Sequence, residues 1–553
     1  MSFNGGRAVV DALHEHDVRT VFTVPGESFL PVLDALYDVS DIDVVATRHE
    51  EGAAFAAEAY AKASGAPGVC MVTRGVGSTH AAIAIHTAMQ DATPLVVLVG
   101  QVGTDHKWRE AFQELDLPHA YAGIAKHALE IPKPARIGEL VSQAFRVATS
   151  GRPGPVIVGL PEDVLYGDAG ASAPFLTDVR LPAMRAADRD EIAAKLSSAE
   201  RPAMIVGREV LAECCTDSAV RLSEATGIPV YTAFRRFDAF PNDHRHYAGN
   251  VSLGTPRHAV AGLYDADLVL VVGDRFDEIT AHGYDLDLSG ADVIHVASDA
   301  SLLGNWRFPS TGIVASAREF LDALATAYDP VEPDDARIDW ARHCRATYER
   351  TSAYEKPFPD DAGAVNLSAA MASLRRHAPP DTALVTDAGN FSAWVPRYFP
   401  FVQSGTHFGP ISGAMGYAVP GAVGIALANP DRRVVALAGD GGFAMTMNEL
   451  AVAGARKLPI IFLVFVNEMY ATIRMHQEKH FPGRPVATDL HNPDFVAIAE
   501  AHGINARRAT SNALFDEAIG AALTARGPVL IEVLEGEEKL AAWRAAVALE
   551  TRA

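Results

Sequence analysis

The sequence predicts an α/β protein that consists of three doubly wound, parallel-sheet domains. Strand-like apolar runs alternate with alanine-rich segments of helical pattern along the chain, which is typical of βα units. Two segments rich in Gly, Pro or acidic residues, 167–174 and 328–335, interrupt this alternation and are expected to link domains. The predicted domains are therefore residues 1–170, 180–330 and 360–553.

The composition excludes several classes of protein. A formal net charge of -22 argues against a general nucleic-acid binder, because that function needs clustered Lys and Arg. No apolar run reaches the ~20 residues that span a bilayer, and the N-terminus lacks the apolar core of a signal peptide. The four cysteines show no metal-type spacing. We therefore expect a cytoplasmic protein without nucleic-acid or membrane partners.

The first and third domains share one order of elements: a strand, a Gly-rich turn, a helix, a proline and a buried strand. This order occurs at residues 72–100 and again at 436–467. Ligands of open α/β sheets bind beyond the carboxyl ends of the strands, where these Gly-rich turns lie. The two turns could therefore face one ligand together.

The Gly-rich turn of the third domain has the features of a metal-bound phosphate site. Gly439, Gly441 and Gly442 allow close approach of the backbone to a phosphate, and the helix that follows offers free N–H groups. Asp440 would repel a phosphate unless a hard divalent cation such as Mg²⁺ lay between them. Asn467 ends the next buried strand, 467 − 440 = 27 residues later, and is expected beside Asp440. The alternative is a helix cap and a strand end without a ligand.

Gly-Asp-Gly followed by a helix, a strand and Asn resembles the cofactor motif of thiamine diphosphate enzymes. The whole chain resembles their acetohydroxyacid (acetolactate) synthase branch, which implies pyrimidine-binding, central and diphosphate-binding domains in that order. The resemblance implies that Asp440, Asn467 and the backbone carbonyl of Met469 hold Mg²⁺. The cofactor-binding residues that it implies are Pro25, Gly26, Glu50, Gly389, Asn390, Gly413, Met415, Gly439, Gly441 and Gly442.

Three residues are catalytic candidates. Glu50 matches the family pattern Arg-His-Glu-x-Gly-Ala, which implies that its carboxyl group bonds N1′ of the cofactor and so favours the imino form that generates the ylide. A solvated carboxylate at a helix start is the alternative. His80 could donate a proton to a product carbanion or bind a carboxylate, or could be a structural histidine. Gln113 is the third candidate. Met415 is expected to wedge beneath the cofactor, or to be core packing.

The substrate pocket combines family-like residues with departures from the family. Residues 109–131 resemble a synthase stretch that places Phe112 and Gln113 in the pocket and Lys126 near its entrance, although core packing and surface exposure are the alternatives. Four pocket positions depart from the synthase pattern, so the acceptor stays open and a more polar one is conceivable. These positions are Glu27, Val76, His80 and His476.

The central domain binds FAD in synthases and pyruvate oxidases, and Arg275 with its surroundings resembles that site. The family's Gly-Gly-Gly turn is replaced here by Gly207, Arg208 and Glu209, whose bulk would obstruct a dinucleotide. The first Asp of the family's Ile-Asp-Ile-Asp falls on Ala297. FAD is therefore a candidate cofactor that the sequence does not favour.

The predicted reaction is thiamine diphosphate-dependent decarboxylation of a 2-keto acid, pyruvate by default, with carboligation to a second carbonyl compound. The alternatives are a decarboxylase or carbon–carbon lyase without carboligation, an FAD-dependent oxidase like pyruvate oxidase, and a non-catalytic relative that binds the cofactor. The family places its cofactor between the first domain of one chain and the third of another. A homodimer or homotetramer with active sites at the subunit interface is therefore expected.

Overall fold

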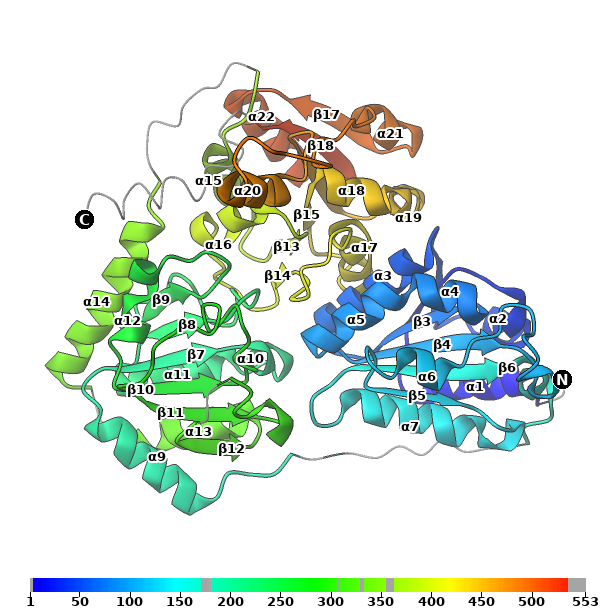
Figure 1. The fold of residues 1–553 in the computed structure, drawn as a ribbon, viewed down its shortest axis with the longest axis horizontal. Coiled ribbons are helices and arrows are strands. Elements are labelled where there is room, and N and C mark those ends of the chain that lie inside the picture. The colour runs from blue at the N-terminus through cyan, green and yellow to red at the C-terminus, as the bar shows by residue number, and fades with distance from the viewer. Residues whose placement is uncertain are drawn as a thin grey trace.

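The computed structural model describes residues 3–170, 179, 181–306, 309–328, 333–354 and 363–535. Three six-stranded parallel sheets with interspersed helices confirm the predicted α/β class (Figure 1). The first domain lies at the lower right of the view, the central domain at the lower left and the third domain at the top. Each domain has its own apolar core between sheet and helices.

The first sheet has the strand order β2-β1-β3-β4-β6-β5. Its strands are β1 (Thr20–Thr23), β2 (Asp43–Ala46), β3 (Gly68–Val72), β4 (Leu95–Gln101), β5 (His127–Glu130) and β6 (Pro155–Pro161). The helices are α1 (Gly5–Glu15), η1 (Glu27–Phe29), α2 (Leu30–Tyr37), α3 (Glu50–Ser64), α4 (Arg74–His80), α5 (Ala82–Asp91), η2 (Thr104–His106), α6 (Leu117–Tyr121), η3 (Pro134–Arg136), α7 (Ile137–Thr149) and α8 (Glu162–Tyr166). His49 caps α3 at its start, and Gly65, with φ 74°, ends it in the left-handed conformation that favours glycine.

The central sheet has the order β12-β11-β10-β7-β8-β9, in which the strand order reverses between β7 and β10. Its strands are β7 (Pro202–Val206), β8 (Val230–Thr232), β9 (Tyr247–Asn250), β10 (Leu268–Val272), β11 (Asp292–Ala297) and β12 (Thr311–Val314). The helices are α9 (Ala186–Ser198), α10 (Arg208–Ala212), α11 (Thr216–Thr226), η4 (Arg257–Val260), α12 (Ala261–Tyr264), η5 (Ala300–Leu302), α13 (Ala317–Tyr328) and α14 (Asp335–Thr351).

The third sheet has the order β14-β13-β15-β16-β18-β17, which repeats that of the first sheet strand for strand. Its strands are β13 (Ala383–Thr386), β14 (His407–Phe408), β15 (Val434–Gly439), β16 (Ile460–Val466), β17 (Asn505–Ala509) and β18 (Val529–Leu534). The helices are α15 (Leu367–His377), η6 (Asn390–Ala393), α16 (Trp394–Tyr398), α17 (Ala418–Ala428), α18 (Asp440–Thr446), η7 (Met447–Glu449), α19 (Leu450–Arg456), α20 (Ala471–His480), α21 (Phe495–Ala501) and α22 (Asn512–Thr524). All seven residues of β16 are buried, as expected for a central parallel strand.

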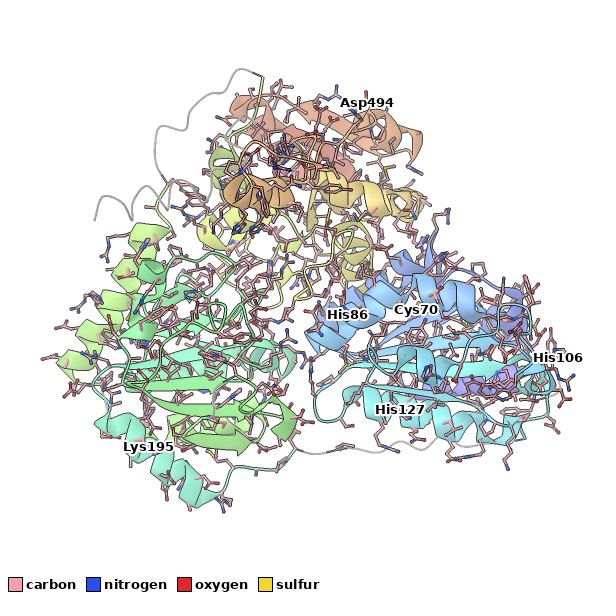
Figure 2. The ribbon with its side chains drawn as sticks, viewed as in Figure 1. Cys70, His86, His106, His127, Lys195 and Asp494 are labelled. Carbon is pink, nitrogen blue, oxygen red and sulfur yellow. The ribbon has the colours of Figure 1, made fainter. Side chains whose placement is uncertain are left out.

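Helix α3 of the first domain packs directly on α17 of the third domain. A Cβ atom at Gly424 would collide with the carbonyl oxygen of Ala56, so the close approach of the helices requires glycine there. Buried charges also join the domains, because Asp91 pairs at 2.7 Å with Arg236 of the central domain and accepts the N–H of Ile411. Side chains of all three domains therefore meet where the domains adjoin (Figure 2).

Some predictions about the ends of the domains are not tested. Residues 171–174 of the first predicted linker, 329–332 of the second and 536–553 of the third predicted domain lie outside the described residues. Within the described part of the chain, no helix combines the length and apolarity needed to cross a membrane. The cytoplasmic location and the domain boundaries stay predictions.

Candidate active site

The carboxyl edge of the third sheet lines an open cleft of about 1270 Å³. Residues of the central domain, among them Phe234 and Ile279, form its other wall. The cleft brings together the predicted third-domain residues, which are Gly389, Asn390, Gly413, Met415, Gly439, Asp440, Gly441, Gly442, Asn467, Met469 and His476.

Asp440 and Asn467 lie side by side at the floor of this cleft. Strands β15 and β16 are parallel neighbours, and Gly439 is paired with Phe465, so the two strands end together. Oδ2 of Asp440 accepts the backbone N–H groups of Asn467 at 3.2 Å and Glu468 at 2.7 Å. Burial raises the pKa of the Asp440 carboxyl group. A divalent cation at this carboxylate would offset that cost of burial.

Two further residues, which the sequence interpretation missed, orient this pair. Nδ2 of Asn492 donates to Oδ2 of Asp440 at 2.8 Å. Nδ2 of Asn467 donates to Glu535 at 2.9 Å. Oδ1 of Asn467 accepts the backbone N–H of Met469 at 3.2 Å, and its second lone pair can bind a cation. Asn492 lies in an irregular segment 492 − 440 = 52 residues after its partner, and no sequence signal links the two.

The walls of the cleft fit a metal-bound diphosphate. A Cβ atom at Gly441 would lie 2.7 Å from the ring of Tyr470, and one at Gly442 would collide with the carboxylate of Asp387. Nδ2 of Asn390 is buried and has no hydrogen-bond partner among the described residues, although its Oδ1 accepts from Thr472 at 2.8 Å. A buried donor of this kind suits a phosphate oxygen. Oxygen ligands beside a glycine cradle are the donor set that Mg²⁺ with a diphosphate requires.

Asp387 also shapes the turn that carries Met415 into the cleft. Its buried carboxylate accepts the N–H groups of Gly416 at 3.0 Å and Tyr417 at 3.1 Å. Burial raises the pKa of Asp387 to about 6. Gly416 has a φ of 81°, which explains the glycine in this turn. The sequence interpretation did not include Asp387.

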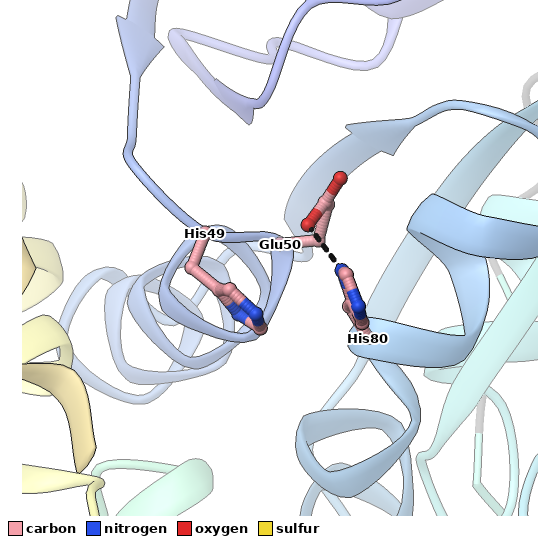
Figure 3. A group of neighbouring side chains, drawn as sticks. All are labelled: His49, Glu50 and His80. Atoms are coloured by element: carbon pink, nitrogen blue, oxygen red, sulfur yellow. Dashed lines mark hydrogen bonds and ion pairs between the residues drawn. The ribbon is translucent and has the colours of Figure 1, made fainter.

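Glu50 and His80 form a hydrogen-bonded pair in the first domain (Figure 3). Oε2 of Glu50 lies 2.9 Å from Nδ1 of His80, and the side chain of Glu50 is only 12% exposed. Nδ1 of His49 accepts the N–H of Glu51 at 3.2 Å, and the His49 ring stacks on that of His80 with centroids 4.6 Å apart. The first turn of α3 and the end of α4 thus hold these side chains together.

One ligand atom from each of His49, Glu50 and His80 lies within 4.8 Å of the others, a spacing that could suit a metal ion. Because Nδ1 of His49 accepts a backbone N–H, the proton of its neutral ring lies on Nε2. That ring therefore has no free lone pair for a cation. The arrangement favours a hydrogen-bonded group over a metal centre.

Other first-domain candidates surround the same strand ends. Gly26 faces Thr73, because a Cβ atom there would lie 2.6 Å from the Thr73 side chain. Oε1 of Glu27 accepts from Arg74 at 3.4 Å. The carbonyl of Gln113 accepts the N–H of Gly75 at 2.9 Å. Pro25 directly precedes Gly26 in the chain. Val76, which follows Gly75, and Phe112, which precedes Gln113, are exposed.

Lys126 has a different environment. Its ammonium group donates to the carbonyl groups of Val147 and Ser150 at the end of α7. Burial lowers the pKa of Lys126. The structure therefore places this side chain against the backbone of its own domain.

Within one chain, the first-domain candidates do not meet the third-domain cleft. Its described lining comes from the central and third domains and includes none of the first-domain candidates. The chain thus carries two half-sites, one around Glu50 and one around Asp440.

Comparisons with known proteins agree with this geometry. The family models of the thiamine pyrophosphate enzymes match residues 3–120 as the N-terminal TPP binding domain, 189–324 as the central domain and 387–533 as the C-terminal TPP binding domain. The chain is 31% identical over 548 residues to a probable acetolactate synthase large subunit of Methanocaldococcus jannaschii, covering 96% of this chain and 91% of the relative.

Two further relatives have similar coverage. The acetolactate synthase large subunit of Corynebacterium glutamicum is 32% identical over 97% of this chain and 87% of its own length. The acetolactate synthase isozyme 2 large subunit of Escherichia coli is 30% identical over 96% and 95%. The chain therefore belongs to the thiamine pyrophosphate enzyme family, in the branch that contains the acetolactate synthase large subunits.

Proposed function

We propose that this chain is a carboligase that decarboxylates a 2-keto acid and joins the remaining acyl group to a second carbonyl compound. The paired oxygen ligands Asp440 and Asn467, beneath a cleft that fits a diphosphate, carry this proposal. Relatives over almost the whole chain are acetolactate synthases, which supports pyruvate as the default donor.

In this proposal the chain's own residues hold the cofactor and move protons. Asp440, Asn467 and the carbonyl of Met469 hold Mg²⁺, and Nδ2 of Asn390 donates to the diphosphate. When bound, thiamine diphosphate supplies a nucleophilic carbon and accepts the electron pair that decarboxylation leaves. Glu50 exchanges a proton with the pyrimidine ring of the cofactor, and this exchange activates that carbon.

The lining of the cleft suits a decarboxylation. Phe237, Phe391 and Ile411 contribute apolar wall, and Met415 projects from the adjacent turn. Such a wall excludes water and favours a reaction in which separated charges disappear. His476 is a polar side chain on this wall and is proposed to contact the carboxylate of a keto-acid acceptor.

We propose that the complete active site forms between two chains. The separation of the Glu50 group from the Asp440 cleft supports this, as do exposed apolar side chains in the first and third domains. They are Trp108 and Phe112 in the first domain and Ile473 and Phe481 in the third domain. A homodimer would combine Glu50 of one chain with Asp440 of its partner, and a homotetramer would repeat this pairing.

Subunit complementation tests the shared site. Co-expression of Glu50→Gln and Asp440→Ala chains should restore activity that neither variant has alone, because each mixed dimer keeps one intact site. Co-expression of Asp440→Ala with Asn467→Ala is the matched control, since both changes affect the same half-site and no mixed dimer is intact. Equal inactivity of both mixtures would refute a site shared between chains.

The central domain supports a reaction without FAD. The crevice at the switch between β7 and β10, where a dinucleotide would bind, contains the chain's own carboxylates. Glu209 accepts the N–H of Ser298 at 3.0 Å, and a Cβ atom at Gly207 would collide with Asp274. These residues do not fit a flavin nucleotide, so the proposal includes no oxidase step. A flavin spectrum of the purified protein would contradict it.

The products decide between carboligation and its alternatives. Purified protein with thiamine diphosphate, Mg²⁺ and labelled pyruvate is offered a panel of aldehydes and 2-keto acids, and products are identified by mass spectrometry. We expect labelled carbon dioxide together with a 2-hydroxy-2-alkyl acid or an acyloin. Free aldehyde as the only product would indicate a lyase. Without any carbon dioxide from a broad keto-acid panel, a non-catalytic role would replace the proposal.

A further inference from the structure

A second cleft, of about 860 Å³, lies between the central and third domains, outside the site described above. The chain after β9, the end of α14 and helix α16 form its walls. It adjoins the cofactor cleft, because Ser252, Leu253, Gly254 and Ala393 line both. Its volume is within the range of about 300–1,000 Å³ that small-molecule sites occupy.

The charge of this second cleft is opposite to that of the chain. Arg257, Arg350 and Arg397 line it, and Asp265 supplies the one carboxylate among the described lining residues. The whole chain, by contrast, has a net charge of -22. Among the described residues, none of the three guanidinium groups has an ion-pair partner. Arg350 donates to the hydroxyl group of Thr347, and Nε of Arg397 donates to a backbone carbonyl. Most of their N–H groups are therefore available to an anion.

Aromatic rings accompany these arginines. The guanidinium carbon of Arg257 lies 4.1 Å from the ring centroid of Tyr264, and that of Arg397 lies 4.9 Å from the ring of Tyr398. Trp394 and Tyr348 also line the cleft, although Trp394 is only 9% exposed. A guanidinium group beside a ring can still form bidentate hydrogen bonds to phosphate, and the accessible part of an aromatic wall can contact a flat heterocycle.

We propose that this cleft binds an organic anion that combines a diphosphate group with a flat heteroaromatic ring, as a nucleoside diphosphate does. The arginines recognise the phosphates and the aromatic wall recognises the ring. The shared segment 252–254 places such a ligand beside the cofactor cleft and outside it. The proposal does not depend on which carbonyl compounds the enzyme joins.

Calorimetric titration of the holoprotein with ADP tests this site. Saturating thiamine diphosphate and Mg²⁺ occupy the cradle at Asp440, so the probe's own diphosphate cannot bind there. We expect saturable binding that is weaker by about tenfold in Arg257→Ala and in Arg350→Ala, each of which removes a charged hydrogen-bond donor. Arg342→Ala is the matched control, because Arg342 is an exposed arginine on α14 that pairs with Asp339 away from the cleft.

Further probes separate the two parts of the ligand. Adenosine alone and pyrophosphate alone should each bind more weakly than ADP. Arg397→Lys keeps the charge but loses the planar fork, so it should weaken ADP binding without changing the thermal unfolding midpoint. No saturable binding of ADP to the holoprotein would overturn the proposal. Wild-type affinity for ADP in Arg257→Ala and Arg350→Ala would also overturn it. Pyrophosphate binding as tight as ADP binding would refute the role of the heteroaromatic ring.

Discussion

Glu50 and His80 are joined by a hydrogen bond of 2.9 Å between Oε2 and Nδ1, although 30 residues separate them in the chain. The carboxylate is nearly buried, whereas the side chain of His80 is 54% exposed. The imidazole thus links a shielded carboxylate to solvent. The stacked ring of His49 restricts the orientation of His80. This pair is the natural first target for mutagenesis.

Replacing Glu50 by Gln should nearly abolish turnover. Gln has the shape of Glu but cannot exchange a proton with the pyrimidine ring, and general acid–base catalysis contributes about 10²- to 10⁴-fold. Hydrogen–deuterium exchange at C2 of the bound cofactor, followed by NMR, measures the affected step directly. Glu51→Gln changes the neighbouring carboxyl group and should leave exchange within a few-fold of wild type. Equal loss in both variants would count against a specific role of Glu50.

Replacing His80 by Gln should lower turnover by about tenfold, less than Glu50→Gln does. Gln keeps a donor close to Glu50 but cannot take up and release a proton as an imidazole does. We therefore expect a lower turnover number with unchanged affinity for the cofactor. His86→Gln, at an exposed position on α5, is the control. Wild-type turnover in His80→Gln would show that His80 is only structural.

Replacing Asp440 by Ala should abolish Mg²⁺-dependent binding of thiamine diphosphate. Asn492→Ala removes only the hydrogen bond that Asn492 donates to Asp440. It should therefore weaken metal binding by about 10- to 100-fold. Titration calorimetry with Mg²⁺ and thiamine diphosphate measures the loss of affinity in each variant. Asn505→Ala, on the exposed part of β17, should bind as wild type. If Asn492→Ala were as damaging as Asp440→Ala, the assignment of Asp440 as the metal ligand would lose its support.

The proximity of Asp440 and Asn467 could be predicted, because neighbouring parallel strands end at the same edge of a sheet and both residues follow buried strands. The shared order of elements in the first and third domains could also be predicted, but their common strand order could not, because the central sheet has the same alternation of elements with a different strand order. Regular strands and helices thus allow contacts between residues that are far apart in the sequence to be predicted.

Contacts made by irregular segments could not be predicted in this way. Asn492 reaches Asp440 from an irregular segment, and Asp387 fixes the Met415 turn across the domain. Lys126 matches a family stretch, yet its ammonium group binds the carbonyls at the end of α7. Side-chain direction depends on tertiary packing, which a linear motif does not encode.

Glu449 makes stability depend on pH where the first and third domains meet. Its buried carboxylate accepts the N–H groups of Arg48 and His49, each at 3.0 Å. Burial raises the pKa of Glu449 from 4.5 to about 7 in the folded chain. A carboxyl group with a raised pKa contributes stability that is fully present below pH 4.5 and is lost as the pH rises through about 7. The loss amounts to at most about 3 kcal/mol.

Glu449→Gln should therefore reduce the fall in the thermal unfolding midpoint between pH 4.5 and 7, because Gln stays neutral throughout. Burial also raises the pKa of Glu51 to about 7, so part of the wild-type pH dependence should remain. A changed hydrogen bond shifts the unfolding midpoint of the variant equally at every pH, and calorimetry across the pH range separates this offset from the slope. Glu517→Gln alters an exposed glutamate, so its unfolding midpoint should depend on pH as that of the wild type does. A Glu449→Gln curve as steep as the wild-type curve would show that Glu449 does not titrate in this range.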